Sequence, residues 1–336
     1  MKKRLLAMLM TGAMVASLAA CGGGSTTGGD SQTSDNKGGD TASGSGCSVD
    51  VILKTTASEY WSYVKAGAEA YAKDNSDVKV EVKGATSETA YDEQQNMIET
   101  DLNSGAYDAF VIAPLQADLV KTLISGKTDP IIAVDTNIDA PEVLSFVGTG
   151  NEDAAAMGGK EAVKAAQDAG WDKVQAIAIS GVQGDGTAMA RLSGYEKGVT
   201  EAGGEFLKGE IQYADAVADK AANCMEAVMQ NHPEGIAIIV CNNDDMAIGA
   251  LQAIQAAGRT VNKDIYLVGV DALDAAKNEV ANGNMTGTVL NDANGQASKA
   301  VECMEELLGG KTYAAGEQSV YVDYVKVTPD NVKDFQ

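Results

Sequence analysis

The sequence predicts an α/β fold built from two doubly wound, Rossmann-like lobes, and two observations carry this prediction. Short, nearly continuous apolar runs such as GIAIIVC (235–241) alternate with longer stretches whose apolar side chains recur at helical spacing. Parallel strands covered by helices on both faces have this pattern. The second observation is that the chain offers nine clear strand candidates, more than one ordinary sheet holds. We therefore expect two parallel sheets.

The strand candidates fall into two similar series. The segment VLSFVGTGNED (143–153) separates them and leads into a helical pattern, with Asn151 as the candidate N-cap. We place the junction between the lobes near Thr149. The expected strands span residues 49–53, 78–82, 108–113, 130–135, 143–148, 173–180, 235–241, 264–271 and 285–291.

The N-terminus predicts export and anchoring. Residues 1–20 combine a basic start with a short apolar run, which is typical of a signal peptide. Cys21 follows Leu-Ala-Ala, as in the bacterial lipoprotein box, so we expect lipidation at Cys21; the alternative is an ordinary signal peptide with a chance cysteine. Residues 21–46 are rich in Gly and Ser and predict a flexible tether between a membrane and the globular part.

Composition argues against several kinds of site. The formal charge of −23 disfavours binding to nucleic acid. The chain has one histidine, His232, and no C-x-x-C spacing, so we expect no metal site, no cofactor and no Ser-His-Asp triad. The cysteines of the globular part read as free thiols, although the spacings leave disulfides open; they are Cys47, Cys224, Cys241 and Cys303.

Polar and aromatic residues follow many of the expected strands. In doubly wound sheets, ligands bind beyond the carboxyl ends of the strands, so these side chains are candidates for one cleft. Each has a simpler reading: Asp, Asn and Ser after a strand often cap the next helix, and Asp244 reads as such a cap. Tyr60 and Trp61 could staple a helix entrance to the core. Arg191, expected in the first turn of a helix over 187–202, could be a surface cation, but there it would oppose the helix dipole.

Taken together, these residues have the chemistry that a sugar requires. Carboxylates accept hydrogen bonds from hydroxyl groups, arginine donates them, and asparagine does both. Aromatic rings pack against the apolar faces of a sugar ring. We therefore expect Tyr60 and Trp61 to meet a ligand ring. Two competing motifs are rejected: GVQGDG (181–186) lacks the lysine of a phosphate loop, and DTNIDA (135–140) lacks the glycine of a calcium loop.

The order of these motifs resembles the type I periplasmic binding proteins of the ribose/galactose group, which serve sugar ABC transporters. The resemblance covers residues 47–326 and is strongest in NNDDMAIGAL (242–251). Its other markers are S-x-Y-W from Ser58, A-V-D ending at Asp135, R-x-x-G-Y from Arg191, G-V-D ending at Asp271 and V-L-N ending at Asn291.

The resemblance implies two lobes joined by a hinge of three crossing segments. The first lobe would comprise residues 47–149 and about 292–319, and the second 150–291 and about 320–336. It also implies a ligand site between them, which would be formed by Ser58, Tyr60, Trp61, Asp135, Thr136, Arg191, Asn243, Asp271 and Asn291.

The resemblance further implies a function without catalysis. We expect a monomeric, extracytoplasmic lipoprotein that binds a pentose or hexose and delivers it to an ABC permease. The alternative is a receptor that presents its ligand to a membrane histidine kinase or chemoreceptor. Thr136 stands where the ribose receptors have arginine, and Ala216 lies near the position of an aromatic residue that closes their site. These differences leave the identity of the sugar open.

Overall fold

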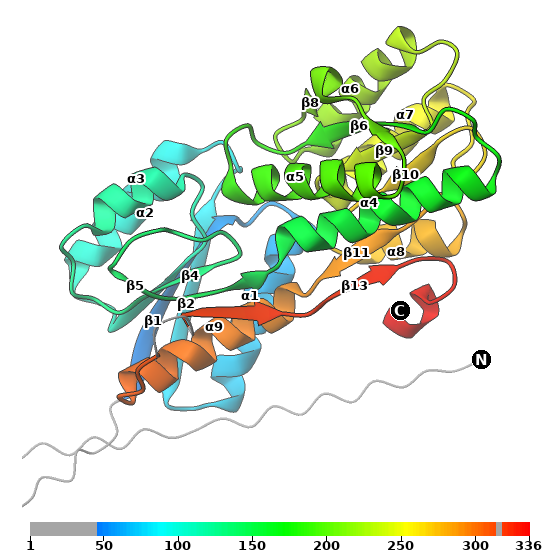
Figure 1. Ribbon diagram of the computed structural model, residues 1–336. Helices are drawn as coiled ribbons and strands as arrows, with labels where there is room; N and C mark the ends of the chain where they lie inside the picture. The colour runs from blue at the N-terminus through cyan, green and yellow to red at the C-terminus, as the bar shows by residue number, and fades with distance from the viewer. Residues whose placement is uncertain (1–45, 314–317) are drawn as a thin grey trace, which may run out of the picture. The chain divides into compact units, whose positions relative to one another are not determined.

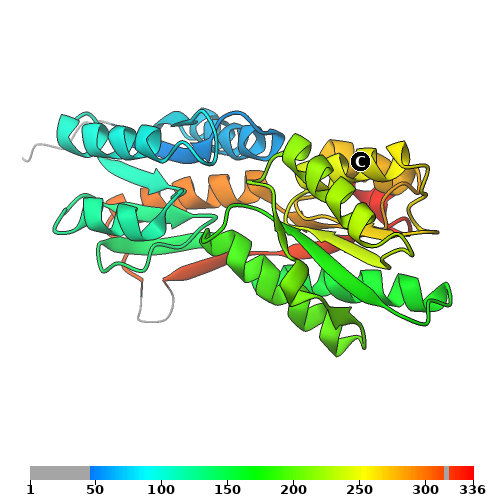
Figure 2. The same ribbon diagram turned by 90° about the horizontal axis from the view of Figure 1, so that it is seen from above.

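The computed structural model describes residues 46–313 and 318–336 and contains two parallel sheets, each covered by helices on both faces (Figures 1 and 2). This confirms the predicted fold class. The expected signal peptide, Cys21 and the tether to residue 45 lie outside the described residues. All described residues belong to one compact unit, so the division into two lobes stays a prediction.

The first sheet has six parallel strands in the order β12-β5-β4-β3-β1-β2. Helices α1 (Glu59–Asp74) and α9 (Ala293–Leu308) pack on one face, and α2 (Tyr91–Ser104) and α3 (Ala117–Ile124) on the other. The apolar side chains of α2 recur four residues apart, at Ile98 and Leu102, and both are buried against the sheet. The strands are β1 (Cys47–Thr55), β2 (Val78–Ala85), β3 (Ala109–Ile112), β4 (Ile131–Val134), β5 (Val143–Thr149) and β12 (Ser319–Val322).

The second sheet has five parallel strands, with β9 and β6 at its centre. All four residues of β9 (Ile238–Cys241) are buried, as expected of a strand covered on both faces. Helices α4 (Asn151–Asp168) and α5 (Gly186–Glu201) cover one face, and α6 (Ala218–Asn231), α7 (Asp244–Ala256) and α8 (Asp274–Ala281) the other. The remaining strands are β6 (Gln175–Ser180), β7 (Glu205–Phe206), β8 (Gln212–Tyr213) and β10 (Tyr266–Val268).

The chain passes between the elements of the two sheets three times. The passages follow β5, β11 (Thr288–Asn291) and β12. β11 pairs antiparallel with β13 (Tyr324–Val327), so two of the passages are hydrogen-bonded to each other. Two short 3-10 helices complete the described part, Lys208–Glu210 and Val332–Phe335.

Each expected strand is present, but some local predictions were wrong. β7, β8, β12 and β13 were not predicted; each has only two or four residues, and most of these are not buried. Gly150 precedes α4, and the Asn151 side chain does not cap that helix; its amide donates to the Thr149 carbonyl. Helix α5 begins at Gly186, so Arg191 lies in its second turn.

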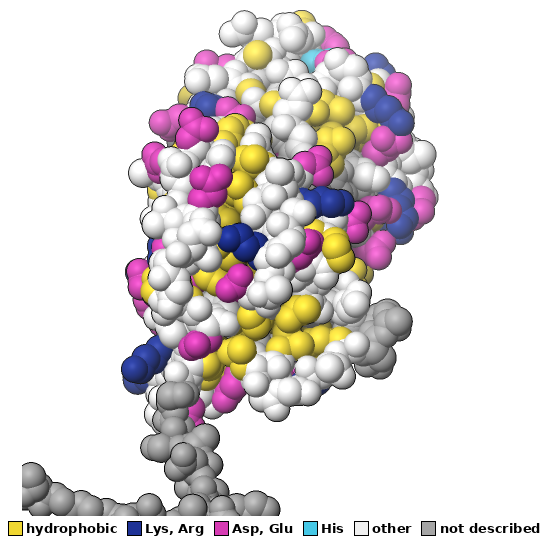
Figure 3. Space-filling view, turned by 90° about the vertical axis from the view of Figure 1, so that its left-hand side faces the viewer, with side chains coloured by type: hydrophobic (Ala, Val, Ile, Leu, Met, Phe, Trp, Pro, Cys, Tyr) yellow, Lys and Arg dark blue, Asp and Glu magenta, His cyan; other side chains and the backbone are white. Residues whose placement is uncertain are grey.

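The cysteines and the charged side chains of the surface can be compared with the sequence analysis. Cys47, Cys224, Cys241 and Cys303 are all free thiols in the described residues. Asp and Glu side chains are spread over the face shown in Figure 3, with Lys and Arg side chains among them. This distribution accompanies the large negative charge of the chain.

Helices α4 and α5 approach each other closely because glycines on α5 leave room for the backbone of α4. A Cβ atom at Gly194 would lie 2.0 Å from the Glu152 carbonyl oxygen, and one at Gly198 would lie 2.1 Å from that of Ala156. Real Cβ atoms do not approach backbone oxygens so closely, so any larger residue forces the helices apart. This spacing holds α5, which carries Arg191, in its place.

We expect Gly198→Ala to lower the free energy of unfolding by about 1–3 kcal/mol, because overpacking shifts the helix backbones. Urea unfolding measures the effect. Gly209→Ala is the control, since a Cβ at Gly209 meets no atom within 4 Å and its backbone φ is not positive. Equal stabilities of the two variants would contradict the close helix contact.

Candidate functional site

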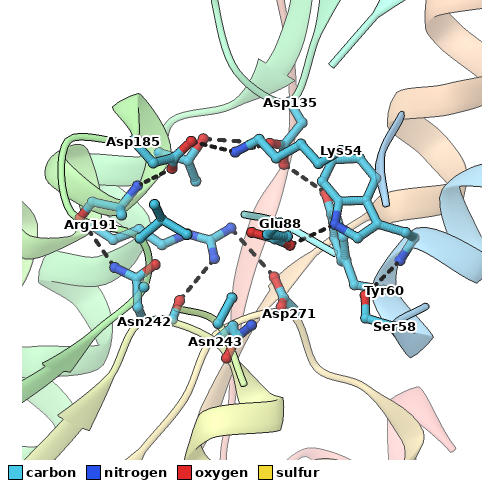
Figure 4. A pocket seen from close by; sticks show the side chains of 16 residues that line it. Lys54, Ser58, Tyr60, Glu88, Asp135, Asp185, Arg191, Asn242, Asn243 and Asp271 are labelled. Atoms are coloured by element: carbon cyan, nitrogen blue, oxygen red, sulfur yellow. Dashed lines mark hydrogen bonds and ion pairs between the residues drawn. The ribbon is translucent and has the colours of Figure 1, made fainter. Parts of the chain in front are cut away.

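A polar pocket collects side chains that follow strands of both sheets (Figure 4). Seven of the nine predicted ligand residues line it. Thr136 and Asn291 do not line it. The lining residues are Lys54, Ser58, Tyr60, Trp61, Glu88, Asp135, Gly181, Val182, Asp185, Thr187, Ala188, Arg191, Ala216, Asn242, Asn243 and Asp271.

The Tyr–Trp pair stands in the first turn of α1. Ser58 caps this helix by accepting a hydrogen bond from the Trp61 amide at 3.5 Å. The two rings meet edge to face, with centroids 5.1 Å apart. Both rings are buried in the core around Val64, so they do anchor the start of α1 to the core, which was the simpler alternative in the sequence analysis. Both rings also line the pocket. That they stack on a ligand ring stays a prediction.

The polar atoms of the two rings bond to carboxylates of the pocket. The Tyr60 hydroxyl donates to Asp135 Oδ1 at 3.0 Å, and Trp61 Nε1 donates to Glu88 Oε1 at 2.8 Å. Burial raises the pKa of Tyr60 well above its ordinary value, and Asp135 adds to this effect. The Tyr60 hydroxyl therefore stays protonated and remains a donor.

Asp135 directly follows β4, and its backbone is left-handed, with φ of 62°. Asp271 has φ of 120° and Ala216 has φ of 60°. Residues other than glycine seldom adopt positive φ, and those that do concentrate at functional sites, where the surrounding structure holds the strain. All three residues line the pocket. The backbone is thus strained at three points of one cavity.

Arg191 is buried beside the pocket and held by three partners. Its Nε donates to Asn151 Oδ1 at 2.8 Å, its Nη1 to the Asn242 carbonyl at 2.8 Å and its Nη2 to Asp271 Oδ1 at 3.4 Å. Burial opposes its charge, but Asp271 and Asp135 outweigh that effect and raise its pKa. The guanidinium is a fixed cation at the edge of the second sheet and not a surface charge.

Asp271 follows β10 and is only partly compensated. Within the described residues, hydrogen bonds to its side chain reach Oδ1 alone, from Arg191 and from Asn291 Nδ2 at 3.1 Å. Burial raises the pKa of Asp271 to about 7, against the opposing effects of Arg191 and Asn291. An unbonded carboxylate oxygen in a buried side chain is available to a ligand.

The cap of helix α7 is Asn243 and not Asp244, which the sequence analysis had expected. Asn243 caps α7 by accepting from the Met246 amide at 2.9 Å, and it also lines the pocket. Asp244 is not the cap. It is fully buried behind the pocket and accepts hydrogen bonds from the Leu273 amide and the Thr288 hydroxyl.

Thr136 and Asn291 support the pocket from behind. The Thr136 hydroxyl donates to Asp135 Oδ2 at 2.9 Å and lies 2.7 Å from the Thr187 hydroxyl. Asn291 Nδ2 donates to Asp271, and Asn291 Oδ1 accepts from Gln296 at 2.6 Å. Both residues orient an aspartate that lines the pocket. Their contact with a ligand stays a prediction.

Sequence reasoning missed the residues that link the two sheets most directly. Lys54, near the end of β1, is buried, and its Nζ lies 2.6 Å from Asp185 Oδ2 and 3.7 Å from Asp135. Burial opposes the charge of Lys54, but Asp185 and Asp135 raise its pKa on balance. The available signal was a lysine directly after the apolar run Val-Ile-Leu (51–53). Asp185 belongs to GVQGDG (181–186), which the sequence analysis considered only as a phosphate loop and rejected.

Glu88, in the connection between β2 and α2, was also missed. The expected strand stopped at residue 82, whereas β2 continues to Ala85, so the search of strand ends stopped short of Glu88. Its carboxylate points into the space that the labelled side chains enclose in Figure 4. Burial raises its pKa. Asn242 and Thr187 complete the set of polar lining residues that were not among the nine predicted ligand residues.

Comparison with known proteins identifies the family. The model of the periplasmic binding protein domain matches residues 49–312. The D-allose-binding periplasmic protein of Escherichia coli (strain K12) is 31% identical over 71% of this chain and 77% of its own length. The D-ribose/D-allose-binding protein of Pseudomonas aeruginosa is 27% identical over 79% of this chain and 83% of its own.

A solved structure extends the likeness to the fold. The carbohydrate transporter solute binding protein of Agrobacterium radiobacter, in complex with D-arabinose, superposes with a TM-score of 0.78 at 25% identity. The match covers 86% of this chain and 96% of that one. All three relatives are binding proteins and not enzymes. They agree with the prediction that this chain functions without catalysis. The chain belongs to the periplasmic binding protein domain family, in its type I class of the ribose/galactose kind.

Proposed function

We propose that this protein is an extracytoplasmic receptor that binds a monosaccharide in the pocket described above and delivers it to an ABC permease. The ligand would be a pentose or a hexose. Asp135, Asp271 and Arg191 would bond its hydroxyl groups, with Asn243 and Ser58 beside them. Tyr60 and Trp61 would provide the aromatic surface.

One observation carries the proposal: carboxylates, an arginine, amides and two aromatic rings from the ends of both sheets line a single pocket. A sugar needs both donors and acceptors around its hydroxyls and an apolar surface against its ring. Small-molecule sites combine placed polar groups with apolar surface, and here Trp61, Val182 and Ala188 supply the apolar part of a mainly polar lining.

The names of the relatives support the same class of ligand. They refer to D-ribose, D-allose and D-arabinose, and to carbohydrate transport. They do not refer to sensing, so the alternative of a receptor for a kinase or chemoreceptor gains no support from them. The particular sugar is not carried over, since the lining of this pocket has its own composition.

We further propose that the protein is held at the membrane by a lipid on Cys21, with residues 21–46 as the tether. In the described part of the chain, none of the helices combines the length and the apolar character needed to cross a bilayer. The support for anchoring is the sequence around Cys21 alone. Mass spectrometry of the exported protein, with Cys21→Ser as control, tests it.

The ionised carboxylate of Asp271 lowers the stability of the folded protein, and this also supports a binding role. Asp271 has a raised pKa, so its ionised form is less stable in the folded than in the unfolded protein. A buried charge that lowers stability is typical of a site that serves a ligand. Arg191, Asp135, Asp245, Asp244 and Tyr60 surround it.

We expect Asp135→Asn to weaken sugar binding about 10-fold to 100-fold, because it removes a charge-assisted hydrogen bond. Asparagine tolerates left-handed backbone, so the fold should remain. A thermal-shift screen with pentoses and hexoses finds the ligand, since binding raises the melting temperature by mass action, and calorimetry measures its affinity. Asp118→Asn, on the exposed surface, is the control. Unchanged affinity in the Asp135 variant would exclude this pocket as the sugar site.

We expect Asp271→Asn to stabilise the empty protein at pH 8 by up to about 4 kcal/mol, since the pKa of Asp271 lies roughly three pH units above its ordinary value and one unit corresponds to about 1.4 kcal/mol. The folded-state pKa of about 7 exceeds the unfolded value of about 3.9. The folded state therefore binds more protons between these values, and stability falls as pH rises from about 4 to 7. At pH 4 the variant and the parent should be nearly equal. Urea unfolding at both pH values decides; a less stable variant at pH 8 would contradict the assignment.

A further inference from the structure

The pocket holds more negative than positive side chains. Four carboxylates line it, from Glu88, Asp135, Asp185 and Asp271, against two cations, Lys54 and Arg191. Each cation is already paired, Lys54 with Asp185 at 2.6 Å and Arg191 with Asp271 at 3.4 Å. Two carboxylates therefore remain in excess. A neutral sugar donates hydrogen bonds to such groups but does not supply the missing positive charge.

Two of these carboxylates keep an oxygen without a hydrogen-bond partner in the described part of the chain. Hydrogen bonds to Asp271 reach only Oδ1, and its side chain is only 4% exposed. The hydrogen bond to Glu88 reaches only Oε1 and comes from the Trp61 indole. Both side chains line the pocket, so Asp271 Oδ2 and Glu88 Oε2 are acceptors left for a ligand.

A second pocket opens next to the first and has the same sign of charge. It shares Ser58, Glu88 and Ala216 with the first pocket. Its other charged lining residues are Glu59, Asp215 and Asp245, and no Lys or Arg belongs to the described residues that line it. Asp215 is paired with Lys220 at 2.6 Å. Glu88 thus lies where the two pockets join, within a negatively charged surrounding.

We propose that the ligand is an amino sugar or amino polyol whose protonated amine binds Glu88 at the junction of the two pockets. This inference rests on the proposed function of the first pocket. An ammonium group offers three donors and one positive charge, and carboxylates bond it more strongly than a neutral hydroxyl. The hydroxyl groups of the same ligand face Asp135, Arg191 and Asp271.

The shifted pKa values agree with this placement. Burial raises the pKa of Glu88, and Asp185 and Asp135 add to it, against the lowering effects of Lys54 and the Trp61 indole. Burial also raises the pKa of Asp245, with Glu59 adding to it. A bound cation would relieve the repulsion among these carboxylates.

Matched ligand pairs test the proposal by calorimetry at pH 7. The pairs are D-glucosamine with D-glucose, D-galactosamine with D-galactose, and an aminodeoxyinositol with inositol. The N-acetyl forms of the two hexosamines serve as uncharged analogues and D-glucuronate as an anionic one. We expect at least one amine to bind ten or more times tighter than both its hydroxyl parent and, for the hexosamines, its N-acetyl form, and to lose affinity as salt is added.

The variant Glu88→Gln keeps an oxygen that can accept from the Trp61 indole but removes the charge. We expect it to reduce the preference for the amine over the hydroxyl parent about tenfold. Glu69→Gln is the matched control, since Glu69 lies on the exposed side of α1 and its ion pair is with Lys65. This control should keep the preference of the parent protein.

The outcomes separate the two proposals. If neutral sugars bind as tightly as their amines, or if glucuronate binds tightest, the inference is wrong and the proposed function stands. An amine preference that survives Glu88→Gln overturns the role of Glu88. If none of the amino or neutral sugars and polyols binds, the proposed function fails together with the inference.

Discussion

The structure depends on the pairing of two buried cations between the ends of its sheets. A buried charge is costly unless it is paired and hydrogen-bonded. Arg191 meets this requirement by drawing on α4, the end of β9 and the end of β10 at once. Lys54 meets it through Asp185, which lies 131 residues further along the chain. Both ion pairs, that of Arg191 with Asp271 and that of Lys54 with Asp185, line the polar pocket.

Much of the fold could be predicted because parallel strands covered on both faces carry a continuous apolar signal. β9 and β4 have every residue buried, and both were expected. β7, β8, β12 and β13 lack that signal, since exposed or two-residue strands depend on their neighbours for pairing. The caps of α4 and α7 were misassigned because Asn and Asp side chains bond to backbone in several local arrangements.

The site was predictable where a polar residue stands at the end of an expected strand, as Asp135 and Asp271 do. Glu88 follows β2 and Lys54 lies in β1, and both strands run further than expected, β2 to Ala85 and β1 to Thr55, so a search of the expected strand ends found neither. The sequence does not show which residues form ion pairs across the fold. The pair of Lys54 and Asp185 exists only in the folded protein, where their charged atoms lie 2.6 Å apart. Thr136 and Asn291 show the converse, since neither lines the pocket and each bonds to an aspartate that does; their contact with a ligand stays a prediction.

The left-handed backbone at Asp135 and Asp271 restricts how this protein can acquire a new specificity. Few residues other than Gly and Asn replace aspartate at such a backbone geometry without added strain. Ser58, Glu88 and Thr187 line the same cavity with negative φ. Evolution or laboratory selection therefore has its freest choice of side chains at these three positions, while the two aspartates persist as a common frame across ligands.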